Sequence, residues 1–271
     1  MRWSKQARSR NSPRLLLTIA FASALTGLAQ TESPRPGVSQ TDAPPPVPVP
    51  FVPDSTKPAI LTKPQAPSAP PIQLRFVVVL DPGHGGEDTG AKLGPGTLEK
   101  DIVLSISTRL RALLNAKGIP VIVTRDADTS PTADDRAAIA NRAKAAACLS
   151  LHATATGTGV HLFTSSLTPA NYGRDEFIPW NEAQATANTQ SVRLASDVNT
   201  ALGNGKLPVL LGRTALRPLN SFTCPALAVE FAPVNAGSGA ASLTDSSYQQ
   251  RVAAALAEAL VAWRVDWRQR P

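Results

Sequence analysis

Short apolar runs alternate with amphipathic stretches from residue 74 to the end of the chain. The first run, at 77–80, has four branched or aliphatic residues in succession and predicts a strand that is buried on both faces. Similar runs predict further strands at 119–124, 148–153, 159–165 and 225–231. Because helical stretches separate most of these runs, the pattern predicts an α/β domain of roughly 190 residues.

The helical stretches carry apolar residues at intervals of three and four positions. Residues 98–118 place a row of Ile and Leu side chains on one face and end at Gly118, which suits a helix C-terminus. A second helix is predicted at 132–147, where Thr132 and Asp135 have the spacing of a capping box.

Two more helices are predicted in the second half of the chain. The first contains Leu194, Val198 and Leu202 and is expected to end at Gly203. The last has five large side chains on one face, which is therefore predicted to pack on the core. They are Tyr248, Val252, Leu256, Leu260 and Trp263.

Residues 1–73 differ in composition from this domain. Residues 1–29 contain five Lys and Arg residues and no acidic residue. The basic residues precede an apolar segment that ends in small residues, which is typical of a secretory signal peptide. A membrane anchor is the competing interpretation, although the segment is short for a span of ~20 residues. Residues 30–73 contain 13 of the 25 prolines and predict a disordered linker, either a spacer reaching into the cell envelope or a passive leader. We therefore expect an exported protein of the periplasm or cell envelope, without a membrane span in its mature form and with its folded domain at 74–267.

The net charge of +7 is unevenly placed along the 271 residues. Five positive charges belong to residues 1–29, which leaves only +2 of the +7 for the rest. A nucleic-acid-binding domain concentrates basic residues in its folded part. The charge therefore gives no support to nucleic acid as a partner.

The first strand runs into the sequence DPGHGGED, which has features of a ligand site. Ligands of open α/β sheets bind beyond the carboxyl ends of strands, and the glycines around His84 allow a sharp turn that leaves its imidazole uncrowded. A phosphate-binding loop is disfavoured, because the stretch lacks a Walker-type lysine and its acidic residues would repel an anion. An ordinary turn with an incidental histidine stays open on this stretch alone.

Three other polar residues lie at the ends of predicted elements. Glu99 opens the first helix, His152 ends the strand at 148–153, and Glu230 interrupts an apolar strand. With His84 they supply what a catalytic zinc site needs: two imidazoles and a carboxylate as ligands, and a second carboxylate as base. Glu99 and His152 have structural alternatives, since Glu99 could serve only the helix dipole and His152 could be a hydrogen-bonded core histidine. A structural role is harder to accept for Glu230, because burial of a carboxylate among apolar residues costs energy unless it is paired.

Two residue types are harder to assign from the pattern. The third histidine, His161, is interpreted as structural or as part of the substrate edge and not as a ligand. Cys148 and Cys224 both enter apolar strands, and although an even cysteine count in an exported protein suggests a disulfide, we favour two buried, reduced cysteines.

Several ordered blocks make residues 75–264 resemble the zinc-dependent N-acetylmuramoyl-L-alanine amidases, which act on bacterial peptidoglycan. The blocks are VVVLDPGHGGEDTGA, LEKDIVL, VIVTRDAD, DRAAIAN, LSLHA, GVHLF and PALAVEF. The resemblance implies a twisted, mostly parallel mixed sheet of about six strands flanked by helices, with one Zn²⁺ per chain at the strand ends. It implies His84, Glu99 and His152 as the zinc ligands and Glu230 as the catalytic carboxylate.

The implied reaction is hydrolysis of the amide between N-acetylmuramic acid and the L-alanine of the stem peptide. Asp88 is a candidate to orient one ligand, with loop capping as the alternative. Thr154 stands where the family has asparagine, so a hydrogen bond at the cleft edge is expected to differ. Residues 231–239 depart from the family after the glutamate; this loop is predicted to contact substrate, so its change bears on substrate detail and not on the chemistry. A peptidoglycan-binding or regulatory protein without turnover, or another zinc amidohydrolase, are the alternative functions. Peptidoglycan or a muropeptide is the expected partner, and an activator protein stays an open question.

Overall fold

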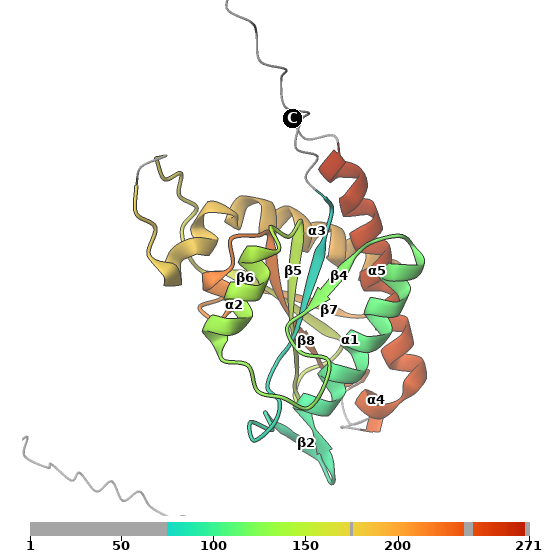
Figure 1. Cartoon of the computed structure of the whole chain (residues 1–271). Helices are drawn as coiled ribbons and strands as arrows, with labels where there is room; N and C mark the ends of the chain where they lie inside the picture. Colours follow the sequence, from blue (N-terminus) through green and yellow to red (C-terminus); the bar gives the residue numbers. More distant parts are fainter. Residues whose placement is uncertain (1–74, 174–175, 236–240, 269–271) are drawn as a thin grey trace, which may run out of the picture. The chain divides into compact units, whose positions relative to one another are not determined.

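A six-stranded mixed sheet forms the centre of the fold, with its strands in the order β4-β1-β5-β8-β6-β7 (Figure 1). The computed structural model describes residues 75–173, 176–235 and 241–268. The strands are β1 (Val78–Pro82), β4 (Val121–Val123), β5 (Ala147–Ala153), β6 (Val160–Ser165), β7 (Val209–Thr214) and β8 (Ala226–Phe231). A separate two-stranded hairpin is made by β2 (Lys92–Gly94) and β3 (Thr97–Leu98).

Helices cover both faces of the sheet. Their bounds are α1 (Glu99–Ala116), α2 (Ala133–Arg142), α3 (Asn188–Asn204), α4 (Ala241–Thr244) and α5 (Ser246–Arg268), with 3₁₀ turns η1 (Trp180–Thr186) and η2 (Leu219–Ser221). Helices α1, α3 and α5 pack side by side on one face, whereas α2, η1 and η2 lie on the other. The predicted α/β fold with a mostly parallel sheet of about six strands is confirmed.

The strand directions determine where polar side chains meet. Strands β1, β5 and β8 are parallel neighbours, so their carboxyl ends lie at one edge of the sheet. Strand β6 runs antiparallel to β8, and its first residues therefore lie at the same edge. Register places His152 beside Glu230 and Glu230 beside His161, in a row across three strands.

The larger of two apolar cores lies under α1, α3 and α5. The predicted core face of the C-terminal helix is confirmed, since all five of its large side chains are buried in this core. Trp263 also donates a hydrogen bond from Nε1 to the carbonyl of Ala146, at 2.9 Å, which ties α5 to the start of β5.

The smaller core, on the α2 side, contains both cysteines, and the prediction that they are reduced is wrong. Cys148 and Cys224 form a disulfide with a Cα–Cα distance of 6.2 Å. Cys148, the second residue of β5, lies next to Ala226 of β8, and Cys224 lies two residues before β8. Adjacent strands thus bring together two cysteines that are separated by 76 positions in the sequence.

Several element bounds also differ from the sequence prediction. The third helix passes Gly203 and ends at Asn204, with Gly205 at its C-cap donating to the carbonyl of Ala201. The edge strand β7 was not predicted. The capping box of Thr132 and Asp135 at the start of α2 is confirmed.

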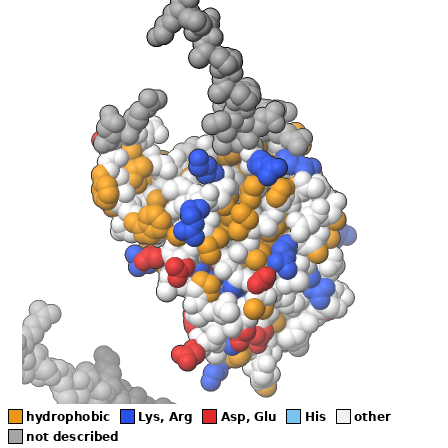
Figure 2. Space-filling view, viewed as in Figure 1, with side chains coloured by type: hydrophobic (Ala, Val, Ile, Leu, Met, Phe, Trp, Pro, Cys, Tyr) orange, Lys and Arg blue, Asp and Glu red, His pale blue; other side chains and the backbone are white. Residues whose placement is uncertain are grey.

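The predicted signal peptide, at 1–29, and linker, at 30–73, lie outside the described residues. Within the residues that are described, no helix combines the length and apolarity needed to cross a bilayer. Figure 2 shows one face of the domain, on which basic and acidic side chains both occur and the acidic ones lie mainly in the lower half. This mixture agrees with the small net charge outside residues 1–29.

Candidate metal and catalytic site

His84 lies in a tight loop directly after β1. Its backbone is in the left-handed region, with φ of 58°, and the turn closes through two hydrogen bonds between the backbones of Gly85 and Asp88. A left-handed histidine is uncommon and needs support from its surroundings. Arg136 gives this support from α2, because its Nη2 donates to the carbonyl of His84 at 2.7 Å, and Arg125 donates to the carbonyl of Gly83 at 2.8 Å.

A buried ion pair holds the loop from below. Asp81, which is fully buried in β1, accepts hydrogen bonds from Arg136 at 2.8 Å, from Thr124 at 2.6 Å and from Ser150 at 2.8 Å. One carboxylate thereby joins β1, α2, β5 and the residue that follows β4. A buried charge with this many partners fixes geometry, and loss of Arg136 would leave the Asp81 charge uncompensated.

Three side chains from distant segments converge beside the loop. The Oε1 atom of Glu99 lies 3.1 Å from Nε2 of His84 and 3.0 Å from Nδ1 of His152. One donor atom from each residue lies within 4.8 Å of the other two, which makes the set a candidate metal site. Glu99 is buried, so its role extends beyond the helix dipole, and both imidazoles are partly exposed.

Two members of this set, His84 and Glu99, have partners on the outer side. Nδ1 of His84 lies 2.9 Å from Oδ2 of Asp88, so the predicted orienting contact is present. Glu99 accepts hydrogen bonds from the backbone amides of Ala91, at 2.9 Å, and Ala153, at 3.1 Å. Such contacts fix the ring orientation and the carboxylate plane, as the outer partners of metal ligands do.

The local charges favour an ionised Glu99. Burial alone raises the pKa of this carboxyl, but hydrogen bonds from His152, from His84 and from the two backbone amides outweigh burial and hold the pKa well below its ordinary value. The hydrogen bond to Glu99 raises the pKa of His84, and this effect outweighs the lowering by burial. A carboxylate that is already ionised can bind a cation without first losing a proton.

Two glycines make room for the set. A Cβ on Gly83 would lie 2.7 Å from Cε1 of His152. Gly90, with φ of 63°, would place a Cβ 2.6 Å from Cδ2 of His84 and 2.7 Å from Oε2 of Glu99. Both positions therefore require glycine for the imidazoles and the carboxylate to approach one another.

Glu230 stands next to the set on β8. Register places it beside His152, at an interstrand spacing of ~4.8 Å, with its side chain on the same side of the sheet. Its Oε2 atom lies 2.7 Å from Nδ1 of His161. His161 was predicted to be structural or part of the substrate edge, and its contact with Glu230 was not predicted. One indication of it lies in the sequence: both residues follow apolar residues of strands that were expected to end near the same edge of the sheet.

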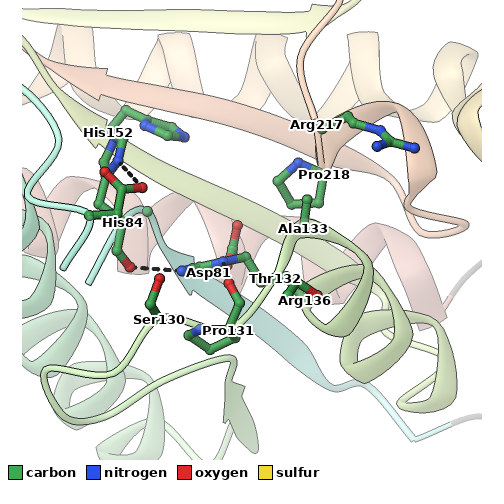
Figure 3. A pocket seen from close by; sticks show the side chains of 12 residues that line it. Asp81, His84, Ser130, Pro131, Thr132, Ala133, Arg136, His152, Arg217 and Pro218 are labelled. Carbon is green, nitrogen blue, oxygen red and sulfur yellow. Dashed lines mark hydrogen bonds and ion pairs between the residues drawn. The ribbon is translucent and has the colours of Figure 1, made fainter. Parts of the chain in front are cut away.

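A cavity of about 290 Å³ opens beside the two histidines (Figure 3). His84, Asp88 and His152 line one side. Arg217 and Pro218 line the other, together with the first residues of α2. A substrate bound here would have its reactive bond near the imidazoles and the rest of its surface against α2.

Two departures from the family pattern can be located. Thr154 Oγ1 accepts a hydrogen bond from the backbone amide of Thr156 at 3.2 Å, so it caps its own turn. In the loop at 231–239, residues 236–240 lie outside the described residues, and the predicted substrate contact there stays a prediction.

Comparison with known proteins shows similarity to one family throughout the domain. AmiA of Escherichia coli K12, an N-acetylmuramoyl-L-alanine amidase, is 47% identical over 77 residues, which are 28% of this chain and 27% of AmiA. The chain thus matches only about a quarter of that relative's length. The amidase Rv3717 of Mycobacterium tuberculosis is 29% identical over 220 residues, covering 70% of this chain and 87% of the relative.

A solved structure with the same fold is the amidase AmiC2 of Nostoc punctiforme. It superposes with a TM-score of 0.56 at 28% sequence identity and covers 72% of this chain and 98% of AmiC2. The family model Amidase_3, described as N-acetylmuramoyl-L-alanine amidase, matches residues 78–262, which include every residue of the site described above. The chain therefore belongs to the N-acetylmuramoyl-L-alanine amidase family.

Proposed function

We propose that this protein is a zinc-dependent hydrolase that cleaves the amide bond between N-acetylmuramic acid and the L-alanine of the peptidoglycan stem peptide. The observation that carries the proposal is the convergence of His84, Glu99 and His152 within 4.8 Å, in a chain of the amidase family. Peptidoglycan or its muropeptide fragments are the proposed substrate, and cell-wall remodelling is the proposed role.

The donor set fits zinc. Two imidazole nitrogens and one carboxylate oxygen are the ligands of many catalytic zinc sites, which keep a fourth position open. The partial exposure of His84 and His152 leaves the set accessible from the cavity. When bound, zinc would lower the pKa of a water ligand to about 7 and polarise the scissile carbonyl.

Glu230 is the proposed general base. It accepts a proton from the attacking water while the water oxygen bonds to the carbonyl carbon, and it then delivers that proton to the nitrogen of L-alanine as the C–N bond breaks. The products are the free lactyl carboxylate of muramic acid and the amine of the peptide. Proton transfer of this kind typically contributes 10²–10⁴-fold to the rate.

The disulfide supports export of the protein. Disulfides persist in oxidising compartments and are rare in the cytosol. Cys148–Cys224 therefore agrees with the basic and apolar N-terminal segment expected to be a signal peptide. We propose that the domain works in the periplasm or cell envelope, with residues 30–73 as a linker.

The test measures zinc, muropeptide binding and turnover on Glu230→Gln. The amide keeps the shape of the side chain but cannot take up the proton, so turnover should fall by at least ~10²-fold while zinc and binding are retained. Glu258→Gln is the matched control, because Glu258 is an exposed residue of α5 paired with Lys117. Mass spectrometry of digested, purified sacculi defines the reaction: the expected new ends are the free lactyl carboxylate of muramic acid and the free amine of L-alanine.

Other outcomes would support the alternative functions. Wild-type protein that binds muropeptides but releases no ends would be a binding or regulatory protein, and release of other ends would indicate a different zinc amidohydrolase. Glu230→Gln with its zinc lost would make Glu230 a ligand. Full zinc retention by both His84→Ala and His152→Ala would remove the proposed ligand set.

A further inference from the structure

The third histidine of the chain lies against the proposed general base. His161, near the start of β6, and Glu230 of β8 are in-register neighbours on antiparallel strands. Nδ1 of His161 lies 2.7 Å from Oε2 of Glu230, and the side chains are 11% and 31% exposed. The imidazole is therefore the more buried partner of this pair, and the carboxylate is the more exposed one.

The chemistry of the two groups determines which atom carries the hydrogen. An ionised carboxylate only accepts hydrogen bonds, so Nδ1 of His161 must be the protonated nitrogen. The bond occupies Oε2 of Glu230, so Oε1 is the oxygen that would accept the proton of the attacking water. A neutral imidazole with Nδ1–H meets this requirement without adding a charge.

The ring is held on its other sides as well. The ring of Phe163, two residues along β6, contacts it edge to face with centroids 6.4 Å apart. Gly157 covers the opposite edge, where a Cβ would lie 2.6 Å from Cε1 and 2.8 Å from Nε2. The loop after β5 thus passes so close to the imidazole that the ring has little room to turn away from Glu230.

This arrangement separates the carboxylate from the metal site. Glu230 has His152, a proposed ligand, beside it on β5 and His161 beside it on β6. A carboxylate without a partner on the β6 side would be free to rotate toward the cation and become a further ligand, where it could not act as a base. The bond to Nδ1 keeps one oxygen on the β6 side.

We propose that His161 is a positioning residue for Glu230: its Nδ1–H bond holds the carboxylate in the orientation that general-base catalysis requires. The proposal rests on the proposed function, because it assumes that Glu230 moves a proton. His161 is not one of the three candidate metal donors, and in this proposal it acts only through Glu230. Its loss should therefore lower kcat and leave zinc content and KM nearly unchanged.

Three substitutions test the position of the donor. In His161→Asn the amide nitrogen takes nearly the place of Nδ1, whereas in His161→Gln it takes nearly the place of Nε2, and His161→Leu has no donor. We expect kcat to fall roughly 10- to 100-fold in the Leu and Gln variants, as for other outer-sphere partners of a catalytic group. The Asn variant should recover most of the wild-type kcat, with KM within about twofold of wild type in all three.

A double variant that combines His161→Leu with Glu230→Gln measures the coupling between the two residues. If His161 acts through Glu230, His161→Leu should lower kcat no further in the Glu230→Gln background, since the two losses are not additive for residues that act as a unit. The proposal would be overturned if His161→Leu lowered kcat by the same factor in the wild-type and Glu230→Gln backgrounds. Equal kcat values for the Asn, Gln and Leu variants would also overturn it. The zinc content and unfolding midpoint of each variant show whether it is folded.

A spectroscopic measurement on the wild-type protein needs no variant to be active. The chain has three histidines, so ¹⁵N-labelled imidazole signals can be assigned, with His161→Leu identifying the third. We expect His161 to be the Nδ1–H tautomer in the zinc-loaded protein. An Nε2–H tautomer would overturn the proposal, while failure of the wild type to cleave peptidoglycan would overturn the proposed function and leave this measurement intact.

Discussion

Asp88 shows how a single residue outside the donor set can control it. Its Oδ2 atom accepts from Nδ1 of His84 at 2.9 Å, while Oδ1 accepts from the backbone amide of Gly90 at 3.1 Å. The first contact makes Nδ1 the protonated nitrogen and leaves Nε2 of His84 directed at Glu99. A carboxylate in this position also increases the basicity of the imidazole, which strengthens its bond to a metal.

We predict that Asp88→Asn lowers the affinity for zinc by roughly 10-fold or more. Asparagine retains an oxygen for the backbone amide of Gly90 but has no charge to place next to His84. Competition with a chelator measures the Kd, and Glu87→Gln, at the exposed neighbouring position, is the control. Unchanged zinc affinity in Asp88→Asn would show that Asp88 serves only to cap the loop.

At the residue scale, the sequence predicted that His84, Glu99 and His152 meet, but not that His161 contacts the proposed base. His84, Glu99 and His152 each lie at the end of a strand or the start of a helix, and parallel strands bring such ends to one edge. The pairing of His161 with Glu230 depends on the antiparallel direction of β6 and on its register. Neither follows from the apolar pattern of a single strand.

At the scale of elements, Tyr248 joins the start of α5 to the strands that carry the proposed base. Its hydroxyl donates to the carbonyl of Ala232 at 2.8 Å and also lies 3.1 Å from the carbonyl of Gly159. Ala232 directly follows β8, and Gly159 directly precedes β6. Burial raises the pKa of Tyr248 to about 12, so the hydroxyl keeps its proton throughout the physiological range.

We predict that Tyr248→Phe lowers the free energy of unfolding by about 1–3 kcal/mol, because it leaves buried carbonyl oxygens without this donor. Tyr172→Phe is the control, since it changes the chain's other tyrosine, which is not buried, and it should stay within about 0.5 kcal/mol. Denaturant unfolding measures both. Equal stabilities of the two variants would contradict the prediction.

The same tyrosine gives stability a pH dependence. The folded-state pKa of Tyr248 is raised above the unfolded value of about 10, so its contribution is present below pH 10 and is lost as the pH rises toward about 12. In Tyr248→Phe this part of the alkaline loss of stability should be absent.

Two element predictions failed for local reasons. Strand β7 is an edge strand in which Leu210 and Leu211 are 50% and 58% exposed, so it lacks the pattern of a buried strand. Its Gly212 packs against the ring of Phe163, which leaves no space for a Cβ, and glycine weakens a strand signal. Gly203 was expected to end α3, but its Cβ position faces open space, and the helix continues for one more residue.

At the scale of the whole domain, the two faces of the sheet differ in their packing. The large core under α1, α3 and α5 contains most of the buried aliphatic and aromatic side chains, and the core under α2 is much smaller. The disulfide lies in the smaller core and links the chain at β5 to the segment leading into β8. Sequence analysis could not predict it, because strand order was needed to bring Cys148 next to Cys224.

We predict that opening the disulfide destabilises the domain while leaving its site intact. In the chain-entropy description, a cross-link between residues 76 positions apart contributes about 4.5 kcal/mol. Cys148 lies at the start of β5, whereas His152 lies near the other end of that strand, so the donor set should keep its geometry in molecules that stay folded. The double variant Cys148→Ala, Cys224→Ala should therefore unfold at a lower denaturant concentration and still bind one zinc. Reductant should lower the unfolding midpoint of the wild type in the same way and should have no further effect on the double variant. An unchanged wild-type midpoint under full reduction would show that the cross-link contributes nothing to stability.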